Sequence, residues 1–325
     1  MKPFIAAVLL VLSLNSSVWA TQEILYARPA SICPINGDGT AYACAFSNLG
    51  VGAWSGTNHI LWNASDETAG RVDPGDTIYI CGHNHVTTAS FRVTPTVSGT
   101  AENLITISGA CPSDPGILDG DGGANGIRLV NLGSAGPINY IVVDSLTFQN
   151  TPSASHDYML SGHDNGRLGL VDRFITISNN RLVNAGWIGM WLWGSEFTIT
   201  NNYLSNIGED AIYVKGGKDT TITSNTVDRV SQVGVGGDCI QFDSATTEPT
   251  IGTGTVIVRD NFCDKTTSPN VKYGILVGPV SGPTFIEHNR ILCPIPTTLQ
   301  SGCNSIYVNA NDTNHTAEIT VRGNY

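Results

Sequence analysis

The sequence predicts an all-β protein that winds into a parallel solenoid, and three observations predict this fold class. A short pattern of β-branched and polar residues recurs from residue 174 to the end of the chain. A second strand-like segment follows the first in each repeat. Glycine occurs 36 times and charged residues make up only 13% of the 325 residues, a composition that disfavours helices and is typical of short strands joined by tight turns.

The recurring pattern places an apolar residue three positions before an asparagine, as in FITISNNRL at 174 and FTITNNYL at 197. The steps between the aligned asparagines are 22, 23, 36, 28 and 35 residues, which is typical of a solenoid whose coils stack on one another. Asparagines at the same place in every coil can hydrogen-bond to their copies at the strand spacing of about 4.8 Å. We therefore expect a structural ladder of Asn180, Asn202, Asn225, Asn261, Asn289 and Asn324.

The second strand of each coil has its own alternation, as in GMWLWG at 189 and DAIYVKGG at 210. Aligning these strands puts apolar residues in two inward columns. Earlier segments such as NLITISGA at 103 fit the first coils, so the sequence predicts a single-stranded right-handed parallel β-helix of about nine coils. The inward columns are Met190, Ile212, Ile240, Ile275 and Ile306, then Leu192, Val214, Phe242, Val277 and Val308.

The chain divides into three parts. Residues 1–20 are typical of a secretory signal, with Lys2, an apolar stretch and small residues before Ala20, which predicts a secreted or periplasmic protein. Residues 21–72 are expected to cap the open first coil, and residues 73–325 to form the solenoid. The sequence stops at Tyr325 within a coil, which predicts either a fragment or a partner that covers this end.

The net charge of −11 argues against a nucleic-acid partner, because phosphate binding needs a basic surface. No stretch after residue 20 is long and apolar enough to span a membrane. A polyanionic polysaccharide would need a locally basic site or a bridging cation on this acidic chain. The oligomeric state stays open.

Eight cysteines after residue 20 fit an oxidising compartment, and none of their spacings is typical of zinc ribbons. We expect disulfides between Cys33 and Cys44, between Cys81 and Cys111, and between Cys293 and Cys303. Cys239 and Cys263 either pair or fill the core. His83 and His85, in CGHNH, are either metal ligands or residues of a loop above the first coils.

Residues between the inward positions are expected to face outward in three columns. Exposed aromatics offer flat apolar surfaces for sugar rings, and carboxylates beside an amine can bind a metal ion or exchange protons. The structural alternative is that the aspartates are turn residues and that Lys215 and Asp243 form a solvated ion pair. The columns are Ile188, Asp210, Asp238, Tyr273 and Asn304; Trp191, Tyr213, Gln241, Leu276 and Tyr307; and Trp193, Lys215, Asp243, Gly278 and Asn309.

Two families resemble this region, and both are right-handed parallel β-helices of the pectate-lyase-like superfamily. GEDAIY, GDCIQF and YGILVG look like the catalytic coils of the polygalacturonase-type glycoside hydrolases. The resemblance implies catalytic roles for Asp210 and Asp238. The third aspartate of that family is Gly237 here, and Tyr273 stands at the family's histidine.

The segment DAIYVKGG resembles a strand of the chondroitinase B and alginate lyase family, in which acidic calcium ligands precede a catalytic lysine. This resemblance implies Lys215 as the base and Glu209, Asp210 and Asp238 as ligands of Ca²⁺. Asp243 stands where that family has an arginine.

The first hypothesis is a secreted polysaccharide lyase that cleaves a uronate-containing chain by β-elimination, with catalytic residues Lys215, Asp210, Asp238 and Asp243. The second is a hydrolase that uses Asp210 and Asp238. The third is a non-catalytic solenoid that binds glycan or acts as an adhesin. The expected substrate-binding residues are Trp191, Trp193, Tyr213, Gln241, Tyr273 and Tyr307.

Overall fold

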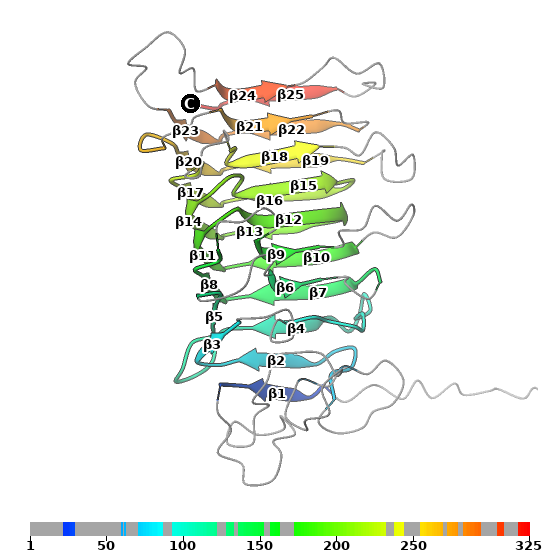
Figure 1. The fold of residues 1–325 in the computed structure, drawn as a ribbon. Helices are drawn as coiled ribbons and strands as arrows, with labels where there is room; N and C mark the ends of the chain where they lie inside the picture. Colours follow the sequence, from blue (N-terminus) through cyan, green and yellow to red (C-terminus); the bar gives the residue numbers. More distant parts are fainter. Residues whose placement is uncertain are drawn as a thin grey trace, which may run out of the picture.

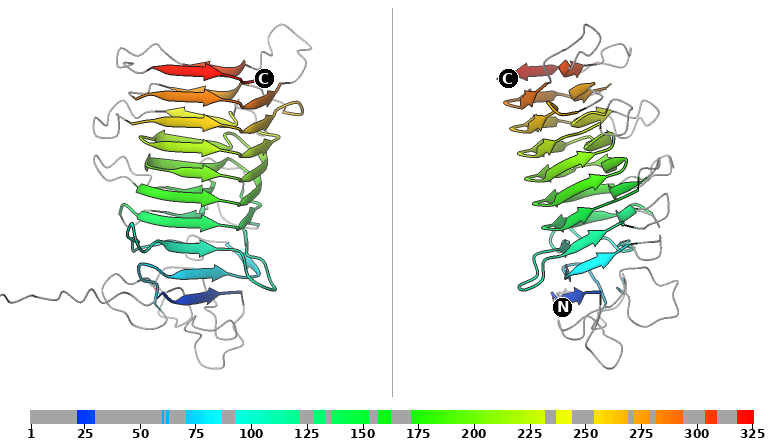
Figure 2. Two further views of the ribbon diagram at one scale, coloured as in Figure 1. Left: turned by 180° about the vertical axis from the view of Figure 1, so that it is seen from behind. Right: turned by 60° about the vertical axis from the view of Figure 1, so that its left-hand side comes forward.

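The computed structural model describes residues 22–29, 60, 62, 71–86, 93–121, 128–132, 136–152, 157–162, 172–231, 237–243, 254–268, 272–278, 282–293, 304–308 and 318–325. In this part of the chain the strands stack along one axis as a right-handed parallel β-helix, and every strand pairing is parallel (Figures 1 and 2). The predicted fold class is confirmed. No helix among these residues has the length and apolarity needed to cross a membrane.

The strands lie in three rows, each of which takes one strand from successive coils. The first, here called the long row, carries the ITIS-type segments that precede the ladder asparagines. It consists of β1 (Ile24–Ala27), β2 (Thr77–Ile80), β4 (Ile105–Ser108), β7 (Asn139–Asp144), β10 (Asp172–Ser178), β13 (Thr198–Thr200), β16 (Thr220–Thr223), β19 (Val256–Arg259), β22 (Thr284–Glu287) and β25 (Ile319–Arg322).

The second row, here called the site row, carries the second strand of each coil. It joins the long row in one 17-stranded sheet, because β10 pairs with the end of β12 as well as with β7 and β13. It consists of β6 (Arg128–Asn131), β9 (Tyr158–Ser161), β12 (Ile188–Ser195), β15 (Ile212–Gly216), β18 (Ile240–Asp243), β21 (Tyr273–Val277) and β24 (Asn304–Val308).

The third row, here called the side row, is a separate 8-stranded sheet that closes each coil. It consists of β3 (His83–His85), β5 (Ile117–Asp119), β8 (Thr147–Gln149), β11 (Arg181–Ala185), β14 (Tyr203–Ile207), β17 (Thr226–Asp228), β20 (Phe262–Asp264) and β23 (Arg290–Leu292).

The asparagine ladder lies where the long row turns into the side row, and it has the structural role expected. Asn202 Oδ1 accepts the backbone N–H of Asn180 at 3.0 Å and the Asn180 side-chain amide at 3.1 Å, and the same pair of bonds recurs up to Asn324. The residue before a ladder asparagine has a positive φ, 56° at both Asn179 and Asn201. Short polar side chains tolerate this left-handed conformation, so the repeated N-N pair makes a sharp corner.

The interior is filled by the apolar residues that alternate with polar ones along each strand. Met190, Ile212 and Ile240 are paired in register and are at most 1% exposed. Leu192, Val214 and Phe242 form the adjoining column and are equally buried. Both inward columns are confirmed, and Ile306 and Val308 continue them as partly buried residues packed against the core.

Two disulfides have both cysteines among the described residues, and each joins neighbouring parts of the stack. Cys81 bonds to Cys111 as expected, and Cys239 bonds to Cys263, which settles the alternative left open by the sequence. Cys293 is disulfide-bonded, while Cys33, Cys44 and Cys303 lie outside the described residues, as does the signal segment 1–20.

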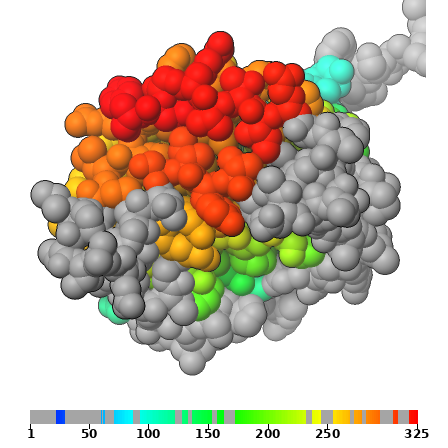
Figure 3. Space-filling model, turned by 90° about the horizontal axis from the view of Figure 1, so that it is seen from above, coloured from blue at the N-terminus to red at the C-terminus, as the bar shows by residue number. Residues whose placement is uncertain are grey.

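The two ends of the stack are described by β1 and by the last coil. Strand β1, inside the predicted capping segment, pairs with β2 and continues the long row. At the other end the last coil lies at the surface, where Val321 is 48% exposed (Figure 3).

Candidate functional site

The outward side chains of the site row form two columns in the expected register. Trp191 pairs with Tyr213 and Tyr213 with Gln241, and the column continues through Leu276 to Tyr307. Because side chains alternate along a strand, burial of Met190 and Leu192 directs Trp191 outward.

We call Trp191, Trp193, Tyr213, Tyr273 and Tyr307 the aromatic strip; all five are half-buried. The ring centroids of Trp191 and Tyr213 are 4.5 Å apart in an edge-to-face contact, and those of Tyr273 and Tyr307 are 4.5 Å apart in a stacked one. The buried Tyr158 of β9 stacks on Trp191 from the preceding coil at 5.4 Å. The strip therefore consists of two ring pairs on successive coils, with Trp193 beside Lys215, and part of each ring surface is left to solvent.

A positive charge lies at one end of the strip. Trp193, Lys215 and Asp243 are paired across three coils, and Lys215 Nζ lies 4.6 Å from the centroid of the Trp193 ring. Both the ring and the Asp243 carboxylate stabilise a positively charged ammonium. This arrangement holds the Lys215 amine at the edge of the strip, within reach of a ligand that lies along it.

Tyr213 and Asp243 are joined by a hydrogen bond in which the Tyr213 hydroxyl donates to Asp243 Oδ2 at 3.4 Å. Burial and the nearby Asp243 charge raise the pKa of Tyr213, so the phenol keeps its proton. Burial also raises the pKa of Asp243, against the opposing effect of Lys215.

Asp210 and Asp238 do not face solvent, which corrects the expectation for the first outward column. Asp210 is 5% exposed and Asp238 1% exposed, and Ile188 in the same column is also buried. Asp210 Oδ1 accepts the backbone N–H of Asp238 at 2.7 Å, and Asp238 Oδ1 accepts that of Tyr273 at 2.9 Å. Both aspartates precede their strands, so they bond to the next coil instead of following the outward alternation.

A buried lysine lies beside these carboxyl groups. Lys265, which follows β20 in the side row, is fully buried, and its ammonium donates to the carbonyl oxygens of Gly237 at 2.6 Å and Tyr273 at 2.7 Å. Burial lowers its pKa, although Asp238 and Asp210 oppose the shift. Sequence reasoning missed Lys265, because it lies beyond the end of β20 and reaches these carboxyl groups from another row.

The carboxyl groups of Glu209, Asp210 and Asp238 all have raised pKa values. Burial raises the pKa of Asp210 to about 6. Burial and the Asp210 charge raise the pKa of the half-buried Glu209 to about 7. The same two causes raise the pKa of Asp238, whose Oδ2 is buried without a hydrogen-bond partner among the described residues. Glu209 is the member of this group that reaches solvent.

Glu209, Asp210 and Asp238 do not fit the calcium site that the lyase resemblance implies. Their ligand atoms are not among the described groups that come within 4.8 Å of one another, and the two aspartates each use one oxygen on a backbone N–H. Lys215 is five residues beyond Asp210, which on an extended strand is about 16 Å. Glu209, Asp210 and Asp238 therefore form an acidic end of the site, with Lys265 and Lys272 nearby, and Lys215 lies at the other end of the aromatic strip. Calcium dependence stays a prediction.

Comparison with known proteins addresses the fold. No curated protein matches the chain. A solved structure of a GH136 lacto-N-biosidase from Eubacterium ramulus is similar with a TM-score of 0.38 and 11% identity, covering 93% of this chain and 67% of that one. A family model described as a right handed beta helix region matches residues 125–325, and the chain therefore belongs to the right-handed β-helix family.

Proposed function

We propose that this chain is a polysaccharide-active protein that holds an acidic glycan along the site row. The aromatic strip carries the proposal. Half-buried tryptophan and tyrosine rings combine a flat apolar face with a polar edge, which is the surface that sugar rings require. A polymer laid along the helix axis crosses one strand about every 4.8 Å, so successive sugar units meet successive coils.

The charges beside the strip favour an anionic glycan in spite of the net charge of −11. Lys215 is held over Trp193 at one end, and the exposed Lys272 lies 5.4 Å from the Tyr273 ring at the other. Each of these two cations offers a partner for a uronate carboxylate, with Asp243 next to Lys215 and Glu209 near Lys272. The proposed ligand is therefore a uronate-containing polysaccharide.

Hydrolysis is the chemistry that the acidic end supports best. Glu209 has a pKa of about 7 and contacts solvent, so it can donate a proton to the leaving glycosidic oxygen near neutral pH. The Asp210 charge helps to hold that pKa up, but Asp210 is 5% exposed and does not contact the attacking water. The proton that the water loses would return through solvent to the Glu209 carboxylate, which restores the acid. Glu209 would supply the proton donor that is missing at Gly237.

Elimination is the second candidate reaction, and the position of Lys215 in the paired strands supports it. Lys215 stands on the same face as the strip, in line with Trp193 and Asp243. In this reaction Lys215 would have to lose its proton before it could take one from the carbon next to the uronate carboxylate.

The test is to incubate the purified protein with alginate, pectate, glycosaminoglycans and neutral glucans, and to measure new reducing ends together with absorbance near 235 nm. We expect reducing ends without absorbance, lost in Glu209→Gln, and affinity about 10-fold weaker in Trp191→Ala. Phe174→Ala is the control, because this exposed aromatic on β10 stacks on Tyr140, away from the strip.

Three other outcomes would each change the proposal. A rise at 235 nm that disappears in Lys215→Ala would replace hydrolysis by elimination. Binding that needs Trp191 but produces no new ends would make the chain a non-catalytic glycan-binding solenoid. Absence of binding to every acidic and neutral chain would reject the strip as a glycan site.

A further inference from the structure

A second cluster of chemically active side chains lies on the side row, in the first coils. His83 and His85 are on strand β3, which corrects the expectation that they belong to a loop. They are two positions apart on an extended strand, so both imidazoles leave the same face. Both are exposed, while Asn84 between them is 6% exposed and points inward.

The backbone beneath the two histidines is held in place on both sides. The Asn84 side-chain amide donates to the carbonyl oxygens of Cys81 at 3.1 Å and Gly82 at 3.0 Å. The Cys81–Cys111 disulfide fixes the residue from which the strand departs. The imidazoles therefore project from a rigid base, which lowers the entropy cost of gathering them around a ligand.

The next coil supplies a carboxylate to the same place. Asp119 of β5 pairs directly with His85 in the sheet, and its Oδ2 lies 2.6 Å from His83 Nε2. Its carboxylate accepts the Gln149 amide at 2.7 Å, the Asn150 amide at 3.1 Å and the Asp121 backbone N–H at 2.9 Å. Asp119 is 3% exposed, so these bonds set the position of its oxygens.

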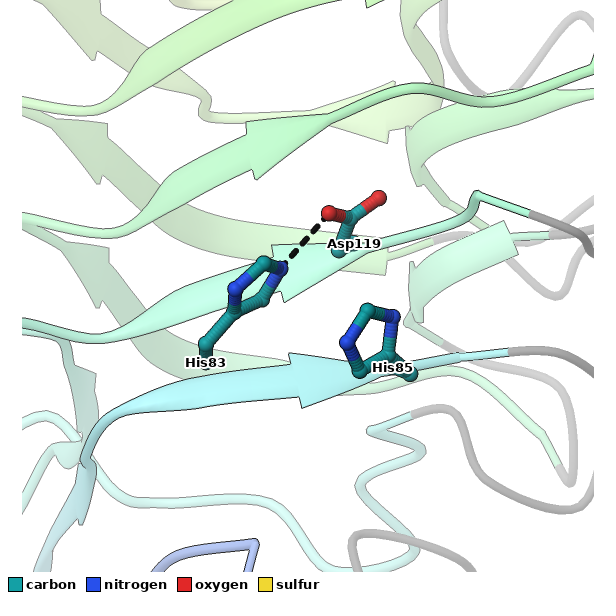
Figure 4. A group of neighbouring side chains, drawn as sticks. All are labelled: His83, His85 and Asp119. Atoms are coloured by element: carbon teal, nitrogen blue, oxygen red, sulfur yellow. Dashed lines mark hydrogen bonds and ion pairs between the residues drawn. The ribbon is translucent and has the colours of Figure 1, made fainter.

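The three side chains converge, as Figure 4 shows: both histidines rise from β3 toward Asp119 on β5. One ligand atom from each lies within 4.8 Å of the other two, and the imidazole centroids are 4.5 Å apart at an interplanar angle of 24°. A simple ion pair between His83 and Asp119 would not need the second imidazole. Two imidazoles and one carboxylate are a ligand set typical of zinc and neighbouring transition metals.

We propose that His83, His85 and Asp119 form a binding site for one divalent transition-metal ion of the zinc class, which ties strand β3 to strand β5. The ion would take the place of the hydrogen bond between His83 Nε2 and Asp119 Oδ2. Three protein ligands leave a coordination position for water. The site is on the side row and is independent of the glycan proposal.

The chain offers an internal control. His288 and Asp260 form a looser pair, with 3.8 Å between Nδ1 and Oδ1, and both side chains are more than half exposed. No second histidine contributes to this pair among the described residues. A surface histidine beside an aspartate is thus present at both places, but only the first has the third ligand.

The experiment is equilibrium dialysis of tag-free protein against Zn²⁺, with the bound metal measured by mass spectrometry. We expect one ion per chain, and little competition from Ca²⁺ or Mg²⁺, which prefer oxygen ligands. His83→Ala and His85→Ala should each weaken binding at least ~10-fold, the effect that loss of even an outer-shell partner produces. His288→Ala should bind as wild type does.

A thermal melt provides the second readout, because a ligand that binds only the folded state raises the melting temperature. Zn²⁺ should raise it in wild type and in His288→Ala, but not in the two β3 variants. The exposed histidine variants should fold, which far-UV circular dichroism checks. No saturable binding, or binding that survives both β3 substitutions, would overturn the proposal.

Discussion

Asp210 Oδ1 accepts the backbone N–H of Asp238 at 2.7 Å, and Asp238 repeats this bond to Tyr273 in the following coil at 2.9 Å. Two of the residues that the hydrolase and lyase resemblances single out therefore form a short ladder that fixes the starts of β18 and β21. Any catalytic role of these carboxyl groups has to be separated from this structural one.

Substitution of Asp238 separates the two roles. Asp238→Ala should lower the free energy of unfolding by about 1 to 3 kcal/mol, because the partly buried N–H of Tyr273 loses its acceptor. Asp238→Asn keeps an acceptor oxygen and removes a buried carboxylate, so its stability should stay near that of wild type. Urea unfolding measures both.

Asp264→Ala is the matched control, since Asp264 Oδ1 accepts the Thr266 N–H at an exposed position, where water replaces the bond. If Asp238→Asn keeps its stability and still cleaves glycan normally, Asp238 is structural alone. An equal loss in Asp238→Ala and Asp264→Ala would contradict the buried ladder.

The free energy of unfolding should depend on pH because of Asp210. Burial raises its pKa from 3.8 to about 6, so between these values the folded chain holds a proton that the unfolded chain has lost. The contribution of Asp210 to the free energy of unfolding is fully present below pH 3.8 and is lost as the pH rises through 6. The total loss is about 3 kcal/mol. The stability of wild type minus that of Asp210→Asn, measured from pH 4 to 8, should fall with pH. A difference that rises would contradict the assignment.

The period of two along each strand explains which parts of the site the sequence could predict. Residues inside a strand alternate faces, so the columns Trp191, Tyr213, Gln241 and Trp193, Lys215, Asp243 follow directly from the buried columns beside them. Asp210 and Asp238 precede β15 and β18, where the chain is still turning, and the alternation does not extend to them. Their depth is set by hydrogen bonds to the next coil, which no local pattern encodes.

Contacts between different rows could not be predicted from local sequence patterns either. Lys265 reaches the acidic end from the side row, and the bond between Cys239 and Cys263 joins the same two rows. The turns between the strands determine how the three rows of a coil lie relative to one another. The coil lengths vary too much for sequence spacing to give that geometry.

The asparagine ladder should be sensitive to loss of a single member. In Asn225→Leu the backbone N–H and side-chain amide of Asn202 lose a common acceptor, and the carbonyl of Ile199 loses a donor. Each unsatisfied buried group costs about 1 to 3 kcal/mol, so the variant should fold poorly or not at all. Asn206→Gly is the control, because Asn206 is a corner residue with a φ of 56° and glycine adopts that conformation freely. Equal thermal stability of the two variants would argue against the ladder.

The disulfide beside the acidic end should affect both stability and function. Removing it in Cys239→Ala/Cys263→Ala frees a loop with a sequence separation of 24, which lowers the unfolding free energy by about 3 kcal/mol. The Cys81→Ala/Cys111→Ala variant, with a separation of 30, should lose a similar amount. Cys239 follows Asp238 directly, so only the first variant should also lose glycan cleavage under conditions in which both are folded. Loss of cleavage in both, or in neither, would show that the acidic end does not depend on this bond.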